Sequence, residues 1–113
     1  MTDISALIKS TLTGIGVPSA FQRYPPGNLP TEYVTFTGYH TAPELEAGDN
    51  ELLTARLIQV NVWSKKNYDV LVKNIRDALE SVGFERTFEY DVPHQDGDSH
   101  YNKVLRFAFF DEY

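Results

Sequence analysis

The chain has 113 residues, no cysteine, and a formal net charge of −6 from 16 acidic and 10 basic residues. This length suits one domain with one hydrophobic core, so we expect residues 1–113 to form a single domain. A hydrophobic content of 42% excludes intrinsic disorder, the lack of cysteine excludes disulfides and thiolate metal sites, and the acidic balance argues against duplex binding by phosphate neutralisation.

The N-terminal segment carries apolar residues at helical spacing: Ile4, Leu7, Ile8, Leu12 and Ile15. Thr2 or Asp3 can serve as the N-cap, and Gly14 or Gly16 can end the helix. We therefore predict an amphipathic helix over residues 3–14, packed through one face. A short strand over residues 20–24 follows, and it stops at residues 25–30, where three prolines remove backbone donors.

Two strands separated by an acidic segment come next. Residues 32–40 alternate, with Val34 and Phe36 on one face and with Tyr33, Thr35, Thr37 and Tyr39 on the other. Residues 42–51 are rich in proline, glycine and acids, which predicts a solvated hairpin loop or an arm ordered only by a partner. Residues 52–63 carry the strongest strand pattern, in which Ile58, Val60 and Val62 oppose Leu57, Gln59, Asn61 and Trp63.

The C-terminal half contains a helix and a hairpin. Asn67 is the expected cap of a helix with an apolar stripe from Leu71 to Val82, and Gly83 lies where a glycine ends such helices. Residues 84–92 form a strand that Pro93 breaks, and the Asp-Gly dipeptide at 96–97 indicates a turn. Residues 101–110 alternate as a last strand, close enough to the previous one to form a hairpin.

The elements follow the order α-β-β-β-α-β-β. This order predicts an α+β fold: a mainly antiparallel sheet of four or five strands with two helices on one face. The second face would then carry Tyr, Thr, Gln, Asn and Trp side chains together with scattered apolar groups. A face with this many aromatic and apolar groups is unfavourable in contact with solvent, so we expect other copies of the chain or other proteins to cover it.

The turn near residue 97 holds potential metal ligands at alternate positions: His94, Asp96, Asp98 and His100. In a strand they would share one face and offer oxygen and nitrogen donors to a divalent ion. Gly97 favours a turn instead, and short polar residues populate turns for their own backbone hydrogen bonds. We therefore predict a solvated loop, with no metal or cofactor. The acids Glu44, Glu46, Asp49 and Glu51 lack the EF-hand order, which favours a charged loop there too.

Motifs for catalysis are missing from the sequence. There is no cysteine, and no serine lies in a Gly-x-Ser-x-Gly elbow. Gly14-Ile15-Gly16 fits neither a phosphate-binding loop nor a dinucleotide fingerprint, and we read it as a helix end. We predict that the protein is not an enzyme. Lys65 and Lys66 are read either as solvated lysines or as a small basic site.

Taken together, the segments resemble the tail-terminator, or tail-completion, proteins of long-tailed phages and prophages. The most characteristic segments are Tyr33-Val34-Thr35-Phe36 after a proline and Gln59-Val60-Asn61-Val62-Trp63-Ser64. An N-terminal helix, Phe21-Gln22-Arg23-Tyr24-Pro25-Pro26, an acidic loop, a helix over 68–79 and the closing strand from Tyr101 to Phe107 complete the resemblance.

The resemblance implies a structural role in the virion tail, with assembly in the host cytoplasm. Such proteins form a ring, expected to be a hexamer, that caps the tail tube protein, contacts head-completion proteins and lets DNA pass without specific binding. They supply no catalytic residues. By position, we expect subunit contacts from Tyr33, Thr35, Tyr39, Trp63 and the loop acids Glu44, Glu46 and Asp49. Asp96 and Asp98 are expected to be pore or loop acids that repel DNA.

Two other interpretations stay open. One is another head–tail connector, although such proteins are usually richer in β-structure. The other is a small ligand-binding or regulatory α+β module of the ferredoxin-like type, which predicts a buried pocket between helix and sheet. No apolar run approaches the roughly 18 residues of a membrane span, so we expect a soluble intracellular protein with no membrane partner.

Overall fold

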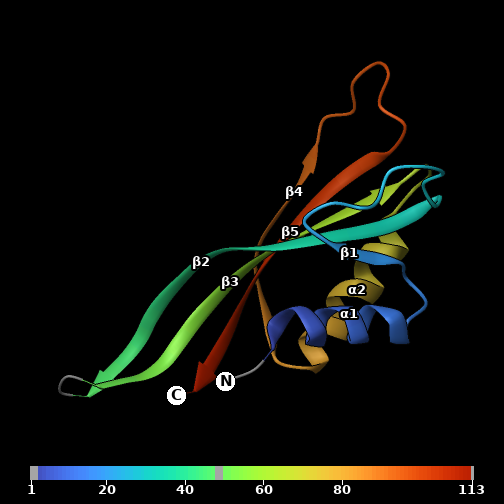
Figure 1. Ribbon diagram of the computed structural model, residues 1–113. Coiled ribbons are helices and arrows are strands. Elements are labelled where there is room, and N and C mark those ends of the chain that lie inside the picture. The colour runs from blue at the N-terminus through green and yellow to red at the C-terminus, as the bar shows by residue number, and fades with distance from the viewer. Residues whose placement is uncertain (1–2, 48–49, 113) are drawn as a thin grey trace.

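The computed structural model describes the backbone of residues 3–47 and 50–112 and the side chains of residues 3–39 and 55–111. Its elements are α1 (Ile4–Gly14), β1 (Ser19–Phe21), β2 (Glu32–Ala47), β3 (Asn50–Ser64), α2 (Asp69–Ser81), β4 (Phe84–Val92) and β5 (Tyr101–Glu112). Both helices pack on the same face of one sheet (Figure 1). The α+β class and the predicted element order are confirmed.

The five strands lie in the order β1-β2-β3-β5-β4. The pairs β2–β3, β3–β5 and β5–β4 are antiparallel, as predicted, but β1 runs parallel to β2 through the register Ser19↔Val34. The sheet is therefore mixed. The proline-rich segment 22–31 carries the chain back to the end at which β1 began, so β2 starts in the same direction as β1. The predicted strand over 20–24 is shorter than expected, because Gln22 adopts a left-handed conformation with φ of 61°.

The helix ends follow local chemistry. The Asp3 carboxylate accepts a hydrogen bond from the Ala6 amide at 3.1 Å, which caps α1. The predicted cap of the second helix is wrong by one residue: the N-cap of α2 is Tyr68, which has no side-chain cap hydrogen bond. The Asn67 side-chain oxygen, one residue earlier, accepts the Asp69 amide at 2.8 Å. Gly83 follows α2 with φ of 106°, a conformation that favours glycine and turns the chain into β4.

The hydrophobic core lies between the two helices and one face of the sheet. Its members have little or no exposed surface: Ile8 and Leu12 from α1, Ile75 and Leu79 from α2, and Val34, Val60, Val62, Leu105 and Phe107 from the sheet. Burial of each such side chain stabilises the fold by about 1.5–3 kcal/mol before entropy is counted. The predicted core faces of β2 and β3 are confirmed, and so are the middle parts of both helix faces. Ile15 and Val82, which the helical patterns included, are wrong as core residues: they are 40% and 37% exposed, because each lies just past the end of its helix.

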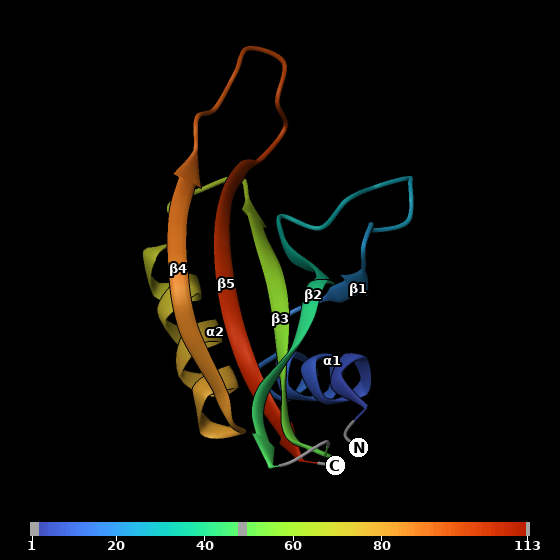
Figure 2. The ribbon, with the colours of Figure 1, turned by 90° about the vertical axis from the view of Figure 1, so that its left-hand side faces the viewer.

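Residues 42–51 were predicted to be a solvated hairpin loop or an arm ordered only by a partner, but residues 42–47 and 50–51 are paired strand residues at the end of a long β-hairpin. β2 and β3 stay paired as far as Ala47↔Asn50, and β5 supports β3 as far as Leu53↔Glu112. We call residues 40–57 the arm. It extends beyond the helices (Figures 1 and 2), and the radius of gyration of 15.2 Å exceeds the value of about 13 Å for a compact chain of this length.

Proline and glycine did not end β2 because its outer side is an edge. Among the described residues, β1 pairs with β2 only from Val34 to Phe36, so beyond that point β2 needs no donors on its outer side. Pro43 is tolerated in such an edge strand. Register shifts after Gly38 and around Leu45 absorb the remaining irregularity.

The second hairpin, β4–β5, has the predicted bounds for β4. A register shift between Arg86 and Phe88 marks a β-bulge at this outer strand. Past the bulge, Glu89 and Asp91 share the helix-facing side, whereas Phe88 and Tyr90 share the other side. The loop 93–100 closes the hairpin at the end of the molecule opposite the arm (Figure 2).

Candidate functional site

Within the described part of the chain, no helix covers the sheet face opposite α1 and α2 (Figure 1), and this face carries exposed aromatic side chains from three strands. Tyr39 of β2, Phe88 and Tyr90 of β4, and Phe110 of β5 are each between 39% and 53% exposed. A patch of large hydrophobic groups on one face is typical of a protein interaction surface. We call this surface, with its aromatic groups, the open face.

Arg106 organises the middle of the open face. In the strand register, Phe88 and Gln59 flank Arg106 on either side. The Arg106 Nε donates to the Gln59 side-chain oxygen at 3.3 Å, and its guanidinium lies 4.9 Å from the centre of the Tyr39 ring. Phe88 and Tyr90 contact each other with ring centres 5.6 Å apart. The side chains of Phe88, Arg106, Gln59 and Tyr39 thus form a row across β4, β5, β3 and β2, and contacts within the chain fix their positions.

Trp63 lies at the end of the open face away from the arm. Its ring stacks on Tyr33 with centres 5.9 Å apart, and its indole N–H donates to the Thr35 hydroxyl at 3.1 Å. Tyr33 is also covered by Tyr24 and by His100. Burial raises the pKa of the Tyr33 hydroxyl.

This packing changes the predicted subunit patch. Tyr33 and Thr35 are only 7% and 8% exposed, because other parts of the same chain already cover them. Trp63 is half-buried and Tyr39 is exposed, so these two keep surface for a partner. The sequence analysis did not single out Phe88 and Tyr90, two aromatic residues at alternate positions in a strand that also holds four charged residues.

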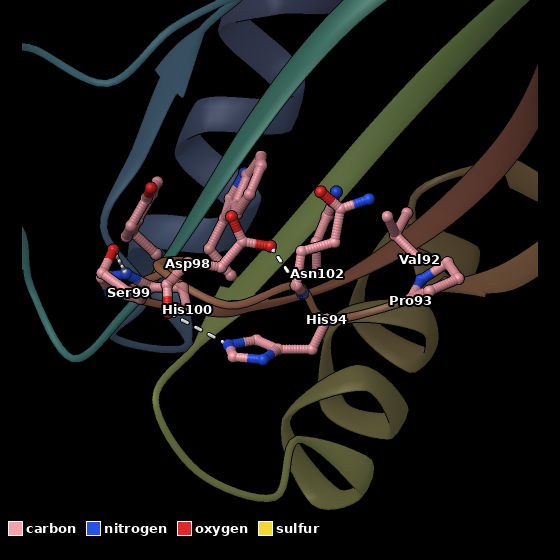
Figure 3. A pocket seen from close by; sticks show the side chains of 10 residues that line it. Val92, Pro93, His94, Asp98, Ser99, His100 and Asn102 are labelled. Carbon is pink, nitrogen blue, oxygen red and sulfur yellow. Dashed lines mark hydrogen bonds between the residues drawn. The ribbon is translucent and has the colours of Figure 1, made fainter.

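Two shallow cavities flank the Tyr33–Trp63 pair. One, of about 360 Å³, lies under loop 93–100 and is lined by Pro93, His94 and Asn102 (Figure 3). The other, of about 330 Å³, lies beside the segment 22–29 and includes Arg23 and Tyr24. Both cavities open on the surface, whereas the core residues Leu12, Ile75 and Leu105 between the helices and the sheet have no exposed surface.

The four potential metal ligands of loop 93–100 serve separate local roles. His94 donates from Nε2 to the Asp98 carbonyl at 3.1 Å, and the Asp98 carboxylate accepts the Gln95 amide at 3.0 Å. His100 is buried, with Nε2 donating to the Pro30 carbonyl at 2.9 Å, which places the Ser99 hydroxyl as donor to Nδ1. Asp96 is exposed beside Gly97, whose φ of 93° marks the predicted turn. No group of three potential ligands occurs among the described residues.

The predicted interface acids belong to the arm. Glu44 and Glu46 lie in the described backbone of β2, and Glu46 is paired in register with Glu51 of β3. Asp49 lies outside the described residues.

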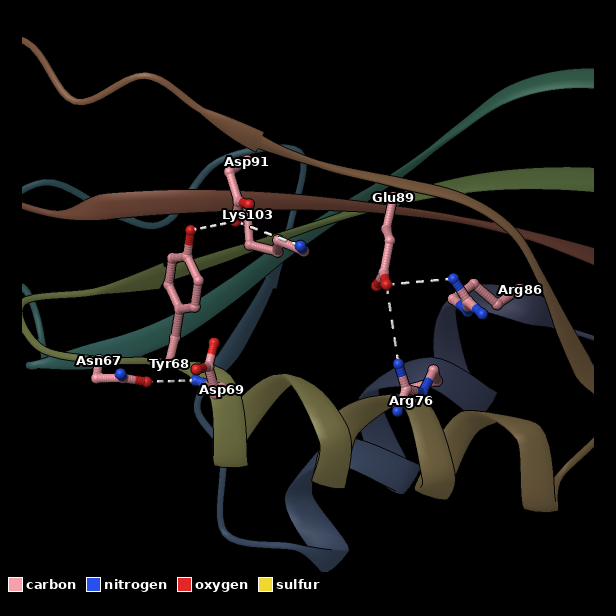
Figure 4. Close-up of polar contacts among 8 residues, drawn as sticks. All are labelled: Asn67, Tyr68, Asp69, Arg76, Arg86, Glu89, Asp91 and Lys103. Carbon is pink, nitrogen blue, oxygen red and sulfur yellow. Dashed lines mark hydrogen bonds and ion pairs between the residues drawn. The ribbon is translucent and has the colours of Figure 1, made fainter.

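A polar network on the helix side joins α2 to the outer strands (Figure 4). The Tyr68 hydroxyl donates to Asp91, which also pairs with Lys103 at 3.3 Å. Arg86 and Arg76 both approach the Glu89 carboxylate, at 3.2 and 3.9 Å. Burial and the hydrogen bond to Asp91 raise the pKa of Tyr68 to about 12, and the same hydrogen bond lowers the pKa of Asp91. This network was not predicted, because the bulge in β4 reverses which residues face the helix.

Lys65 and Lys66 directly follow β3 and lie beside a cavity of about 410 Å³, which Tyr68 and Tyr101 also line. Lys66 makes a long 3.8 Å contact with Glu32 and stays largely exposed. Both lysines are exposed, so the small basic site remains one of the two readings.

Comparison with known proteins adds no family: no family model matches the sequence, and no curated protein matches it significantly. Within the described part of the chain, no helix is long and apolar enough to span a membrane.

Proposed function

We propose that this protein is a structural subunit of a phage tail, a tail terminator that closes into a ring at the end of the tail tube. The observation that carries the proposal is the open face, on which Tyr39, Phe88, Tyr90 and Phe110 expose large hydrophobic surfaces. Helices cover only the other face of the sheet. Copies of the chain, or neighbouring parts of the virion, would remove these aromatic groups from water.

The shape of the molecule supports a ring. The chain is 53 Å long and 27 Å wide, with the arm at one end and loop 93–100 at the other (Figure 1). A ring requires two different surfaces on each subunit that meet head to tail and close. The two dissimilar ends and the open face supply such surfaces, and a hexamer remains the expected closure.

The charge of the chain suits passage of DNA without specific binding. The net charge of −6 and the exposed Asp96 on loop 93–100 favour repulsion of phosphates at any surface that lines a bore. Asp98 contributes its charge to the same loop while its carboxylate accepts the Gln95 amide. Tail tube protein and head-completion protein are the partners that this role requires.

The ligand-binding alternative has less support. A ferredoxin-like binding module needs a pocket between helix and sheet, but Leu12, Ile75 and Leu105 fill that space with no exposed surface. The arm and the open face have no role in such a module. A different head–tail connector would share the open face, and only its position in the particle separates it from a terminator.

Electron microscopy of particles assembled without this protein tests the proposal. We expect tails of uncontrolled length that fail to join heads, and addition of the purified protein should restore both properties. A Phe88→Ser/Tyr90→Ser variant should fold normally, because both side chains are exposed, but it should restore neither. Tails of normal length that join heads in the absence of the protein would contradict the proposed role.

A further inference from the structure

Arg106 is a half-buried cation that has no carboxylate partner among the described side chains. The other cations without an ion pair in that part of the chain are all exposed to water: Lys9, Arg23 and Lys65. Arg106 donates through Nε to Gln59 and lies over an aromatic ring, so its two terminal nitrogens remain available on the open face. A protein that covers this face removes water from the guanidinium, which is unfavourable unless that protein supplies a carboxylate.

Glu85 gives the open face a second charge, of opposite sign. In the β4–β5 register Glu85 is opposite Ala108 and Phe88 is opposite Arg106, so all four residues lie on the open side of the sheet. At about 3.3 Å per residue and about 4.8 Å per strand, the backbone positions of Glu85 and Arg106 are about 8 Å apart. The Glu85 side chain is exposed and has no ion pair among the described residues. The open face therefore presents a positive and a negative group at a fixed spacing.

The helix side of the molecule carries a matching pair of charges. Lys65 and Asp69 line the cavity of about 410 Å³ together with two tyrosines, and neither has an ion pair among the described side chains. Lys66 lines the same cavity, but its contact with Glu32 at 3.8 Å offsets its charge. Val70 is 73% exposed, more than any other large hydrophobic residue in the described part of the chain. We call this cavity, with the adjoining Val70, the α2 notch.

The open face and the α2 notch cannot meet within one molecule. The open face lies on one side of the sheet, and α2 packs against the other side (Figure 2). A contact between these two surfaces is therefore possible only between molecules, and it joins two different surfaces head to tail. A closed ring is built from a contact of this kind, repeated from each subunit to the next.

The two surfaces match in charge, in apolar groups and in area. β5 has 12 residues, about 40 Å, and four neighbouring strands span about 19 Å, so the open face offers about 750 Å², close to the roughly 800 Å² per partner of a standard interface. We propose that the open face of one copy docks on the α2 notch of the next copy, where Arg106 pairs with Asp69 and Glu85 pairs with Lys65. This inference rests on the proposed ring and names its repeating contact.

An exchange of charge between two variants tests the contact. In Arg106→Glu both members of the Arg106–Asp69 pair are negative, and in Asp69→Arg both are positive, so each variant alone should repel its own copies. When the two variants are mixed in equal amounts, each open face meets an α2 notch of opposite charge. In sedimentation equilibrium we expect each variant alone to self-associate at least about tenfold more weakly than the wild type, and the mixture to recover the wild-type association.

Lys9→Glu and Glu80→Arg are the matched controls. Both residues are exposed on the helices and have no ion pair among the described side chains. These controls should associate like the wild type, alone and mixed. Recovery in the mixture of Arg106→Glu and Asp69→Arg also shows that both variants fold. Should either charge reversal prevent folding, Arg106→Gln and Asp69→Asn remove one charge each and should weaken self-association about fivefold, the value for a good surface ion pair.

The outcomes separate this contact from the proposed function. Variants that associate as strongly as the wild type, or a mixture of folded variants that stays as weak as its components, would overturn the contact. If the wild type is monomeric in solution, the same variants are compared as rings on tail tubes. Rings formed by each variant alone would overturn the contact and leave the terminator role standing. Loss of rings in Arg106→Glu but not in Asp69→Arg would show that the tube protein covers the open face, which also overturns the contact. Absence of wild-type association both in solution and on tubes would overturn both proposals.

Discussion

Replacement of Thr35 by valine should lower the free energy of unfolding, because it removes the hydrogen bond between Trp63 and Thr35. Valine has nearly the shape of threonine, so no cavity forms, but the Trp63 indole N–H loses its 3.1 Å acceptor. An unsatisfied buried donor costs about 1–3 kcal/mol. Trp63 is half-buried and water reaches it in part, so we expect the lower end, about 1 kcal/mol.

Urea unfolding followed by tryptophan fluorescence measures this effect, because Trp63 is the only tryptophan. A loss of about 1 kcal/mol lowers the midpoint by about 0.5–1 M urea. Thr37→Val is the matched control: Thr37 lies on the same strand and face, and its hydroxyl donates only to the neighbouring Gly38 carbonyl. Thr35→Ser should keep most of the stability. Equal midpoints for Thr35→Val and Thr37→Val would refute the reasoning.

Other substitutions probe the polar network, the core and the turns. Tyr68→Phe should remove a step near pH 12 from an absorbance titration of the tyrosines. Because the folded pKa of Tyr68 lies above the ordinary 10.0, the stabilisation that the substitution removes is present below pH 10 and is lost as the pH rises from 10 to 12. The lowered pKa of Asp91 makes its contribution present above its ordinary 3.8 and lost in stronger acid, so the wild type should lose its advantage over Tyr68→Phe there in denaturation assays. Leu105→Ala should cost about 2–5 kcal/mol in chemical unfolding, and unchanged stability would contradict its place in the core. Gly83→Ala should destabilise more than Gly97→Ala in thermal melts, since both glycines have positive φ but only at Gly83 would a Cβ meet a β5 ring carbon at 3.2 Å; equal melting temperatures would refute that contact.

The spacing of apolar residues and the positions of glycine and proline predicted the helices and the bounds of β4. The spacing of Ile4, Ile8 and Leu12 predicted α1, and the breaks at Gly83 and Pro93 bounded β4. The parallel direction of β1 was not predictable in this way, since alternation along a strand carries no information about the strand beside it. An arm was one of two alternatives for residues 42–51, but its strand pairing within the chain was not predicted, because proline and acids favour a loop. Pairing of β2 with β3 and the support of β5 decide the outcome.

The candidate surface was predicted only in outline. Alternation correctly placed Tyr33, Thr35 and Trp63 opposite the core, but it could not show that Tyr24 and His100, distant in sequence, cover Tyr33. The bulge before Phe88 is a single extra residue, and it exchanges the faces of every side chain that follows it in β4. A period-2 pattern cannot locate such a step.

The bulge in β4 affects whether this outer strand can pair with a strand of another molecule. β4 is an outer strand with nine residues, long enough to template pairing with another chain and to seed fibres. The β-bulge between Arg86 and Phe88, together with the charged residues Glu85, Glu89 and Asp91, makes pairing with a strand of another molecule unfavourable. Pro43 disrupts the far edge of β2 in the same manner. Pairing with a strand of another molecule is therefore unfavourable at these positions on both edges of the sheet.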